Sequence, residues 1–525
     1  MPSWSSTVLP SRKSIFLVLL VILTLQLALT ATMRFSASPR AWLIVTMAAV
    51  GHAQDGNSSS NLSWAVPAKS DIDDLSTILN RTGVYGFVFN SSQTPESIRY
   101  STYNWCNMPH VRTREYPRAD SSFDLIYVEV IHRHHKRTPY AANTFPVETY
   151  GWDCSDQGLF YYGSQLPVDP ADTSASTYWS VYNSTSNPLR APGFPGNCQF
   201  PQITTAGLRD SHQHGLDLAS VYKTLLGFLP ETYDPELSTF RVTSNTITSQ
   251  VASSLIPGLY PALSSAVVPL LIQPAAIDSL QPSYSCPASS ALYRSYASGA
   301  TTGQWQTHLD MTAPLYATLD TLSGVAPTSA EWHVSWDHYY DNLSARLCHA
   351  LPLPCSANNT KNCVTQEQAD TVFRLGQWEY SYTYRAAGPD TLRAAVSGYG
   401  IWVAELADTL RNKAGLGNST VEDKVKYRHN VAHDGSVSRL LSILQVDRMV
   451  WPGMGAEVVF ELFSREFGEA SKEWYVRVLW GGQILRSSSP ALGLMDMVPL
   501  KQVLAYLDGL VGQGAQRVPG LCNTS

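Results

Sequence analysis

A mostly apolar run, Phe123 to Ile131 (FDLIYVEVI), constrains the fold more than any other segment. Its β-branched residues do not alternate cleanly with polar ones, which is the pattern of a strand buried on both faces of a sheet. A cluster of charge follows, from Arg133 to Pro139 (RHHKRTP). Active sites of α/β sheets lie at the carboxyl ends of their strands. The sequence therefore predicts an α/β fold with a site directly after this strand.

Further strands and helices are predicted along the chain. Two more strand-to-helix units are expected at 239–259 and 425–444, antiparallel strands at 456–463 and 474–480, and a closing helix at 498–511. Aromatic-rich helical stretches at 331–347 and 366–384 resemble an inserted cap. The predicted fold class is thus α/β, a central mixed sheet flanked by helices with an inserted smaller helical cap domain.

The predicted domain boundaries follow these changes in composition. They are a signal or targeting region at 1–53, a glycosylated N-terminal extension at 54–120, an α/β domain at 121–279 and 391–525, and the helical cap at 280–390.

The net charge of the chain argues against a nucleic acid as a partner. The 525 residues include 36 Lys and Arg against 42 Asp and Glu, a net charge of −6. No basic surface for a nucleic acid is expected from this balance. With 44% hydrophobic and only 15% charged residues, the composition is that of a folded chain with a large core.

Two apolar runs near the N-terminus have the character of export signals, 15–31 and 41–50. The second follows Arg34 and Arg40 and ends in small residues before Gln54, where we expect signal peptidase to cut. The first run is either a type II membrane anchor or sequence upstream of a start at Met33. A secreted protein is therefore predicted, with a membrane-anchored one as the alternative if 15–31 is retained.

Cysteines and glycosylation sites agree with an oxidising compartment. Eight cysteines can form four disulfides in any of 105 pairings, among which the sequence does not choose. Nine Asn-x-Ser/Thr sites predict N-linked glycans; they begin at Asn57, Asn61, Asn80, Asn90, Asn183, Asn342, Asn358, Asn418 and Asn523.

The residues after the first strand have the pattern of a phosphate site. Arg133 and Arg137 flank His134, and each guanidinium can bind a phosphate with two hydrogen bonds while the imidazole acts as a nucleophile between them. A second motif, His433-Asp434, follows another apolar strand and precedes a helix. These two residues offer one more donor to the phosphate and a general acid for the leaving oxygen.

Together the two motifs resemble those of the histidine acid phosphatases, a branch of the histidine phosphatase superfamily with R-H-G-x-R-x-P early and H-D late in the chain. Other segments are similar to that family as well, namely 202–207 (QITTAG), 240–261, 474–485, 490–492 and 495–500. The resemblance spans about 123 to 510, and the fungal secreted acid phosphatases and phytases are the relatives it indicates.

The resemblance implies a double displacement on a small phosphomonoester substrate. His134 attacks phosphorus and becomes a phosphohistidine, Arg133, Arg137 and His433 bind the phosphate oxygens, and Asp434 protonates the leaving alcohol. It implies no metal and no cofactor, because the arginines supply the positive charge. An acidic optimum follows from the need for a protonated Asp434.

Two departures from the family pattern weaken this prediction. The glycine after the nucleophile is His135 here, and the second arginine of R-S-T-x-x-x-R-T, a phosphate ligand in the family, falls on Ile247. Losing that arginine removes charged hydrogen bonds of roughly 1.5 to 3 kcal/mol each. Lys136 or His135 are the side chains that would replace it.

Two rival functions stay open at this point. A metal-dependent hydrolase would use imidazoles from His132-x-His134, His212-x-His214 and His433. A catalytically weak or inactive secreted glycoprotein that binds phosphorylated ligands would explain His135 and Ile247. The sequence does not identify the leaving group.

Overall fold

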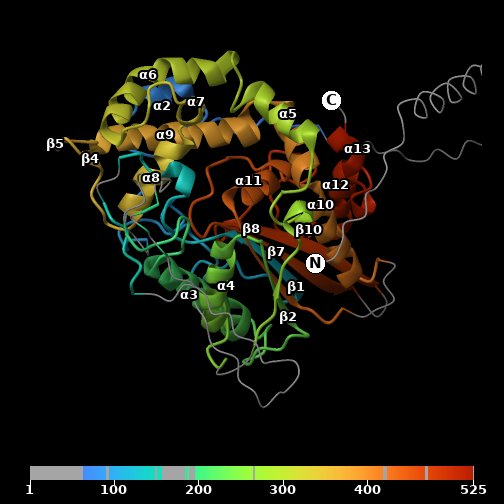
Figure 1. Cartoon of the computed structure of the whole chain (residues 1–525). Helices are drawn as coiled ribbons and strands as arrows, with labels where there is room; N and C mark the ends of the chain where they lie inside the picture. Colours follow the sequence, from blue (N-terminus) through green and yellow to red (C-terminus); the bar gives the residue numbers. More distant parts are fainter. Residues whose placement is uncertain are drawn as a thin grey trace, which may run out of the picture. The chain divides into compact units, whose positions relative to one another are not determined.

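A mixed sheet of eight strands lies at the centre of the structure (Figure 1), a computed structural model. The structure describes residues 63–523 except 90–93, 148–149, 157–181, 183, 185, 188–195, 264–266, 418–422 and 468–470. The strands of this sheet are β1 (Asp124–Arg133), β2 (Ser238–Val242), β3 (Leu270–Leu271), β6 (Tyr427–Ala432), β7 (Glu457–Phe467), β8 (Ser471–Trp480), β9 (Gln483–Ile484) and β10 (Val498–Pro499). Their order is β10-β8-β7-β1-β6-β2-β3, and β9 pairs with β8.

The directions of the strands determine at which end of the sheet the loops that follow them lie. β1, β6, β2 and β3 run parallel to one another, whereas β7 is antiparallel to β1, β8 to β7 and β10 to β8. Arg133 lies opposite Ala432, and Val242 lies opposite Val431. The chain therefore leaves β1, β6 and β2 at the same edge of the sheet, so the residues that follow these strands meet there.

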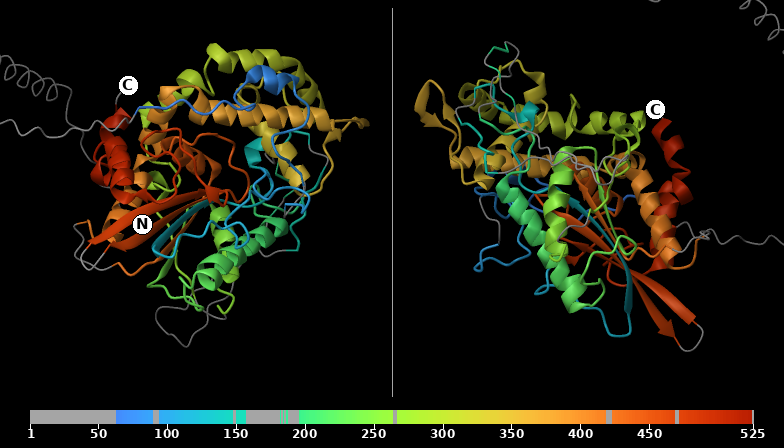
Figure 2. Two further views of the ribbon diagram at one scale, coloured as in Figure 1. Left: turned by 180° about the vertical axis from the view of Figure 1, so that it is seen from behind. Right: turned by 60° about the horizontal axis from the view of Figure 1, so that its bottom comes forward.

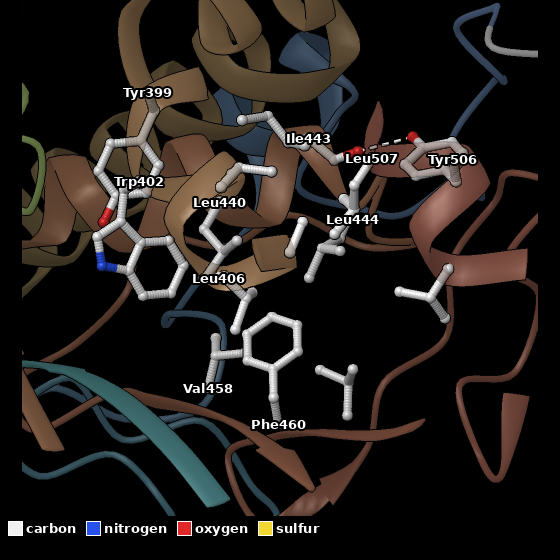
Figure 3. Close-up of a cluster of buried hydrophobic side chains, with 14 of the residues drawn as sticks. Tyr399, Trp402, Leu406, Leu440, Ile443, Leu444, Val458, Phe460, Tyr506 and Leu507 are labelled. Atoms are coloured by element: carbon white, nitrogen blue, oxygen red, sulfur yellow. Dashed lines mark hydrogen bonds between the residues drawn. The ribbon is translucent and has the colours of Figure 1, made fainter. Parts of the chain in front are cut away.

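Helices cover both faces of the sheet (Figures 1 and 2). One face carries α3 (Thr205–Ala219) and α4 (Thr246–Leu259). The other carries α5 (Pro287–Tyr296), α10 (Pro389–Lys413), α11 (Asp434–Ile443), α12 (Leu500–Val511) and α13 (Val518–Asn523). Figure 3 shows the core of this second face, where Leu406, Leu440 and Leu507 pack above Val458 and Phe460 of β7. Burial of these side chains supplies the main driving force for this layer.

A second group of helices has a core of its own beside the sheet. It contains α2 (Leu75–Asn80), α6 (Gly303–Ser323), α7 (Ala330–His333), α8 (Asp337–Cys348) and α9 (Gln366–Ser381). The short hairpin of β4 (Cys355–Ser356) and β5 (Asn359–Cys363) projects from it (Figure 1). The predicted α/β class with a central mixed sheet is confirmed, while the predicted boundaries of the cap stay a prediction.

Local differences from the sequence-based expectations have physical causes. The helix expected over 331–347 is divided into α7 and α8, because the backbone N–H of Trp336 donates to the Glu379 carboxylate at 3.0 Å instead of continuing a helix. Residues 103–111, expected in a loosely structured extension, are buried. Trp105 and Met108 pack in the second helical core, and a Cys106–Cys348 disulfide attaches this segment to α8.

Four disulfides join all eight cysteines, as the even number predicts; besides Cys106–Cys348 they are Cys154–Cys198, Cys286–Cys522 and Cys355–Cys363. Four such bonds fit an extracellular or lumenal protein. Among the described residues, no helix is both long enough and apolar enough to cross a bilayer. The predicted export segments at 15–31 and 41–50 lie outside the described residues.

Candidate active site

The turn after β1 presents the predicted nucleophile. The backbone N–H of His134 donates to Ala432 of β6 at 3.0 Å, and that of Arg133 donates to Ala456 at 2.9 Å. His134 Nδ1 lies 3.0 Å from the carbonyl oxygen of His135. Because a carbonyl only accepts, Nδ1 carries the proton and the lone pair is on Nε2. The turn thus fixes both the position and the tautomer of His134.

The 202–207 segment supports this turn from the side of α3. Thr138 donates its N–H to Gln202 at 2.9 Å, and Thr204 donates to Lys136 at 3.2 Å. At Gly207, a Cβ atom would lie 2.0 Å from the Lys136 carbonyl oxygen. A side chain at that position would therefore push the turn away, which is the physical reason for glycine in this motif.

Two buried arginines frame His134. Arg133 donates to the Pro452 carbonyl at 2.6 Å and stacks over Trp105 at 4.7 Å. Arg137 forms an ion pair with Asp341 at 3.0 Å and lies over the ring of Tyr140 at 4.1 Å. Within the described part of the chain, the Nε–H groups of both arginines have no hydrogen-bond partner. Buried, charged and unpaired donors of this kind suit an anionic ligand.

The second motif lies beside the first. His433 follows β6 and is the N-cap residue of α11, and its ring lies 5.5 Å from that of His134. Thr243, which follows β2, holds His433 Nε2 at 3.0 Å. Asp434 Oδ2 accepts from Trp451 Nε1 at 2.9 Å and lies 3.1 Å from Arg133 Nη2. The structure therefore brings all five predicted site residues, Arg133, His134, Arg137, His433 and Asp434, to one edge of the sheet.

The site favours neutral imidazoles beside an ionised carboxylate. Burial, followed by the charges of Arg133 and Arg137, holds the pKa of His134 well below its usual value. Burial also lowers the pKa of His433 to about 4. For Asp434, burial acts to raise the pKa, but Arg133, the Trp451 N–H, His433 and Arg137 together lower it. A neutral His134 keeps its lone pair available for attack on phosphorus.

Neither Lys136 nor His135 takes the place of the arginine expected at position 247. Ile247 is completely buried in the apolar core between α4 and the sheet. Lys136, one expected substitute, forms a buried ion pair with Asp210 at 2.9 Å. His135, the other, packs against His132 and His214 instead of His134. The expectation that Lys136 or His135 compensates is therefore wrong, because both side chains point to the α3 side of the turn.

Sequence reasoning missed several residues that complete the site. Trp451 and Trp105 contact Asp434 and Arg133, and Asp341 on α8 holds Arg137. Partial burial, followed by the charges of Asp341 and Asp434, raises the pKa of Asp337, whose side chain is 46% exposed. These residues lie in loops and in α8, where no motif marks them. The spacing of four between Asp337 and Asp341 is the only signal that could have found the pair.

The histidines proposed for a metal hydrolase do not come together. His212 is exposed on α3, whereas His214 on the same helix is buried. His134 contacts His433, and His132 contacts His214. A different set, His132, His135 and His214, places one nitrogen of each residue within 4.8 Å of the others.

Comparison with known proteins identifies relatives, although no family model matches the chain. Counting factor 60 of Dictyostelium discoideum is 26% identical, and the match covers 65% of this chain and 77% of that protein. A protein of Danio rerio named 2-phosphoxylose phosphatase 1 is 21% identical over 80% of this chain and 84% of its own. The Homo sapiens protein of the same name is 23% identical, and the match covers 73% of this chain and 76% of that protein.

Solved structures with a similar course of the chain include the phytase of Hafnia alvei. It is 13% identical, with a TM-score of 0.48, and the match covers 76% of this chain and 100% of that chain.

Proposed function

We propose that this chain, which belongs to the histidine acid phosphatase family, hydrolyses phosphomonoesters through a phosphohistidine on His134. The observation that carries the proposal is the meeting of four kinds of group at the ends of β1 and β6. These are an imidazole with its lone pair on Nε2, two buried arginines whose Nε–H groups have no partner among the described residues, a second histidine, and a carboxylate. Each group has a separate task in phosphoryl transfer.

In the first step His134 Nε2 attacks phosphorus, and the bond from phosphorus to the ester oxygen breaks. Arg133, Arg137 and His433 stabilise the charge on the other phosphate oxygens. Asp434, protonated when it acts, gives its proton to the leaving alcohol. Arg133 already lies 3.1 Å from Asp434, so one guanidinium adjoins both the phosphate and the proton donor.

In the second step the Asp434 carboxylate accepts a proton from water while the water oxygen attacks phosphorus. The bond from phosphorus to Nε2 breaks, inorganic phosphate leaves, and Nε2 recovers its lone pair. Nδ1 keeps its proton throughout, because the His135 carbonyl oxygen accepts its hydrogen bond at 3.0 Å. The turn therefore returns to its starting state after each cycle.

Phosphate release from an aryl phosphate, 2-phosphoxylose and phytate, measured from acidic to neutral pH, tests this function. The protein is expressed from Gln54, and His134→Ala is the control for the nucleophile. We expect phosphate release at acid pH that survives addition of a chelator to the assay and is lost in His134→Ala. Wild-type rates no higher than those of the variant on every ester would refute it.

Ile247 supports a second candidate, a phosphate-binding protein without turnover. An apolar side chain replaces a charged one that would bind the transferring phosphate, and transition-state charge is what such enzymes stabilise. In this case calorimetry with inorganic phosphate detects binding in the wild type and in His134→Ala alike. The enzyme, in contrast, releases phosphate catalytically and depends on His134.

The same proposal includes secretion as a glycoprotein cleaved before Gln54. Asn80, Asn358 and Asn523 are exposed, and the four disulfides require an oxidising compartment. Asn342 is 1% exposed, and its amide donates to Asn143 at 3.0 Å, so this site is not expected to carry a glycan. Peptide mapping after enzymatic removal of glycans should identify Asn358 as a glycosylated residue and Asn342 as an unmodified one. The proposal would be contradicted if Asn80, Asn358 and Asn523 all lacked a glycan.

A further inference from the structure

Three buried histidines surround the turn that carries His134. His132 is the next-to-last residue of β1, His135 follows the nucleophile, and His214 lies on α3; all three are 0% exposed. Neither their rings nor their charges take part in the proposed phosphoryl transfer. One ring nitrogen from each lies within 4.8 Å of the others. Three imidazoles gathered in an apolar interior need a reason, because each carries a polar edge out of water.

Hydrogen bonds fix the tautomers of two of these rings. His132 Nδ1 lies 2.8 Å from the Arg133 carbonyl oxygen and therefore carries the proton, which leaves the lone pair on Nε2. His214 Nε2 lies 2.9 Å from a Glu457 carboxylate oxygen and donates to it, which leaves the lone pair on Nδ1. The other Glu457 oxygen accepts the backbone N–H of Val111. In both rings the lone pair is therefore on the nitrogen that does not take part in this hydrogen bond.

The protein satisfies the lone pair of His214 but leaves that of His132 without a partner among the described residues. His132 Nε2 and His135 Nδ1 have no hydrogen-bond partner in the described part of the chain. His135 Nε2 donates to His214 Nδ1 at 3.2 Å, a hydrogen bond that coordination of one ion by both nitrogens would replace. Buried nitrogens without partners are rare in folded proteins and point to a bound ligand or water.

The backbone makes room for the unusual ring of His135. Gly455 has φ +71°, and a Cβ there would lie 2.4 Å from His135 Cε1. The loop beside His135 therefore has room for its ring only because residue 455 is a glycine.

We propose that His132, His135 and His214 bind a divalent transition-metal ion, zinc in the first instance, with Glu457 orienting His214. A carboxylate that accepts a hydrogen bond from a metal-bound histidine is common at metal sites, and imidazole ligands select zinc and similar transition metals over magnesium or calcium. Zinc–nitrogen bonds of about 2.0–2.1 Å place tetrahedral ligand atoms roughly 3.4 Å apart. The His135–His214 pair at 3.2 Å has this spacing. A shift of roughly 1 to 1.5 Å by the third ring closes the largest gap.

The ion would cross-link β1, the turn after it and α3. Because His132 and His135 bracket His134 in the chain, the ion would hold the nucleophile's backbone without touching the substrate. The site is fully buried, so the metal enters during folding. The inference is independent of the proposed function, since metal content and activity are measured separately.

Elemental analysis of the full secreted chain, produced in medium supplemented with Zn²⁺, tests the proposal. We expect stoichiometric zinc in the wild type and its loss in His214→Gln and in His135→Gly. His308→Gln is the matched control, because His308 is a buried histidine paired with a carboxylate, Glu379, at 2.7 Å but lies outside the cluster. It should retain zinc. If His214→Gln fails to fold, His135→Gly, which installs the smaller residue, still decides the question.

Thermal melting supplies a second readout. The wild type, unfolded with its disulfides intact and refolded with Zn²⁺ or with Co²⁺, should melt at a higher temperature than after refolding with a chelator. The difference should vanish in His135→Gly and persist in His308→Gln. A wild type that contains no stoichiometric metal and melts identically under both conditions would overturn the proposal and leave a hydrogen-bonded histidine pair. Metal retained in both His214→Gln and His135→Gly would overturn it as well.

Discussion

At the scale of single residues, Asp434 is held by two donors of different strength. Arg133 contributes a charge 3.1 Å away, and Trp451 contributes an N–H at 2.9 Å. Both favour the ionised carboxylate, whereas a general acid needs the proton. The proposed mechanism therefore requires low pH or a bound phosphate dianion whose negative charge opposes the arginines.

Asp434→Asn removes the proton donor and should reveal its role through the leaving group. For an alkyl phosphate, whose alkoxide leaves poorly, we expect kcat to fall about 10²- to 10⁴-fold, the usual contribution of general acid catalysis. For an aryl phosphate with an acidic phenol, we expect a much smaller loss in forming the phosphoenzyme. Single-turnover rates with both esters measure this, and equal losses would contradict the assignment.

Trp451→Phe should shift the pH profile in a defined direction. The groups facing Asp434 are Arg133, Arg137, His433 and Trp451, with Tyr380 nearby. Removing the indole N–H withdraws one interaction that lowers the pKa of Asp434, so that pKa rises. The acid then stays protonated to higher pH, and the alkaline limb of kcat moves up. Trp305→Phe, which loses a bond to a backbone carbonyl in the second helical core, is the control and should leave the limb in place.

At the scale of elements, the register of β1, β6 and β2 assembles the site. Arg133 opposite Ala432 brings His134 beside His433, and the end of β2 brings Thr243 to His433. Long apolar runs made these strands predictable to within a few residues, because burial on both faces leaves a clear signal. The direction in which His135 and Lys136 point was not predictable, since it depends on Asp210 and His214 of α3, far away in the sequence.

The buried pair of Lys136 and Asp210 yields a stability prediction for the junction of β1 and α3. Their side chains are 0% and 2% exposed. Lys136→Met should reduce the free energy of unfolding by roughly 3–5 kcal/mol, because it removes the cation that forms an ion pair with the buried Asp210 carboxylate. Adding Asp210→Leu should recover much of that loss. Urea unfolding of the single and double variants measures the loss and the recovery of the free energy of unfolding. A Lys136→Met variant with normal stability but reduced phosphate affinity would show instead that Lys136 binds the phosphate.

At the scale of the whole molecule, a core on each face of the sheet, the core of the second group of helices and four disulfides hold together the described part of the chain. Family, fold class and the even pairing of cysteines were predictable, because motifs, apolar runs and counts are local properties of the sequence. The pairing itself and the contribution of residues 103–111 were not, because they depend on contacts such as Cys106–Cys348, separated by 242 residues.

The disulfides should differ in their effect on stability. Cys106–Cys348 closes a loop of 242 residues and is buried at both ends, whereas Cys355–Cys363 closes only 8 in an exposed hairpin. Replacing Cys106 and Cys348 by serine should cost about 2–5 kcal/mol, and replacing the hairpin pair should cost clearly less, because a longer loop gains more entropy in the unfolded chain. Unfolding midpoints of the two double variants compare them; equal losses would contradict this ranking.

The most direct test of the account is to trap the phosphoenzyme. Wild type and Asp434→Asn are mixed with an aryl phosphate, quenched in alkali, where phosphohistidine survives, digested and mapped by mass spectrometry. We predict a phosphate on His134 in both, more persistent in Asp434→Asn because water is no longer deprotonated, and none in His134→Ala. Catalytic release of phosphate without modification of His134, or modification of another residue, would contradict the central claim.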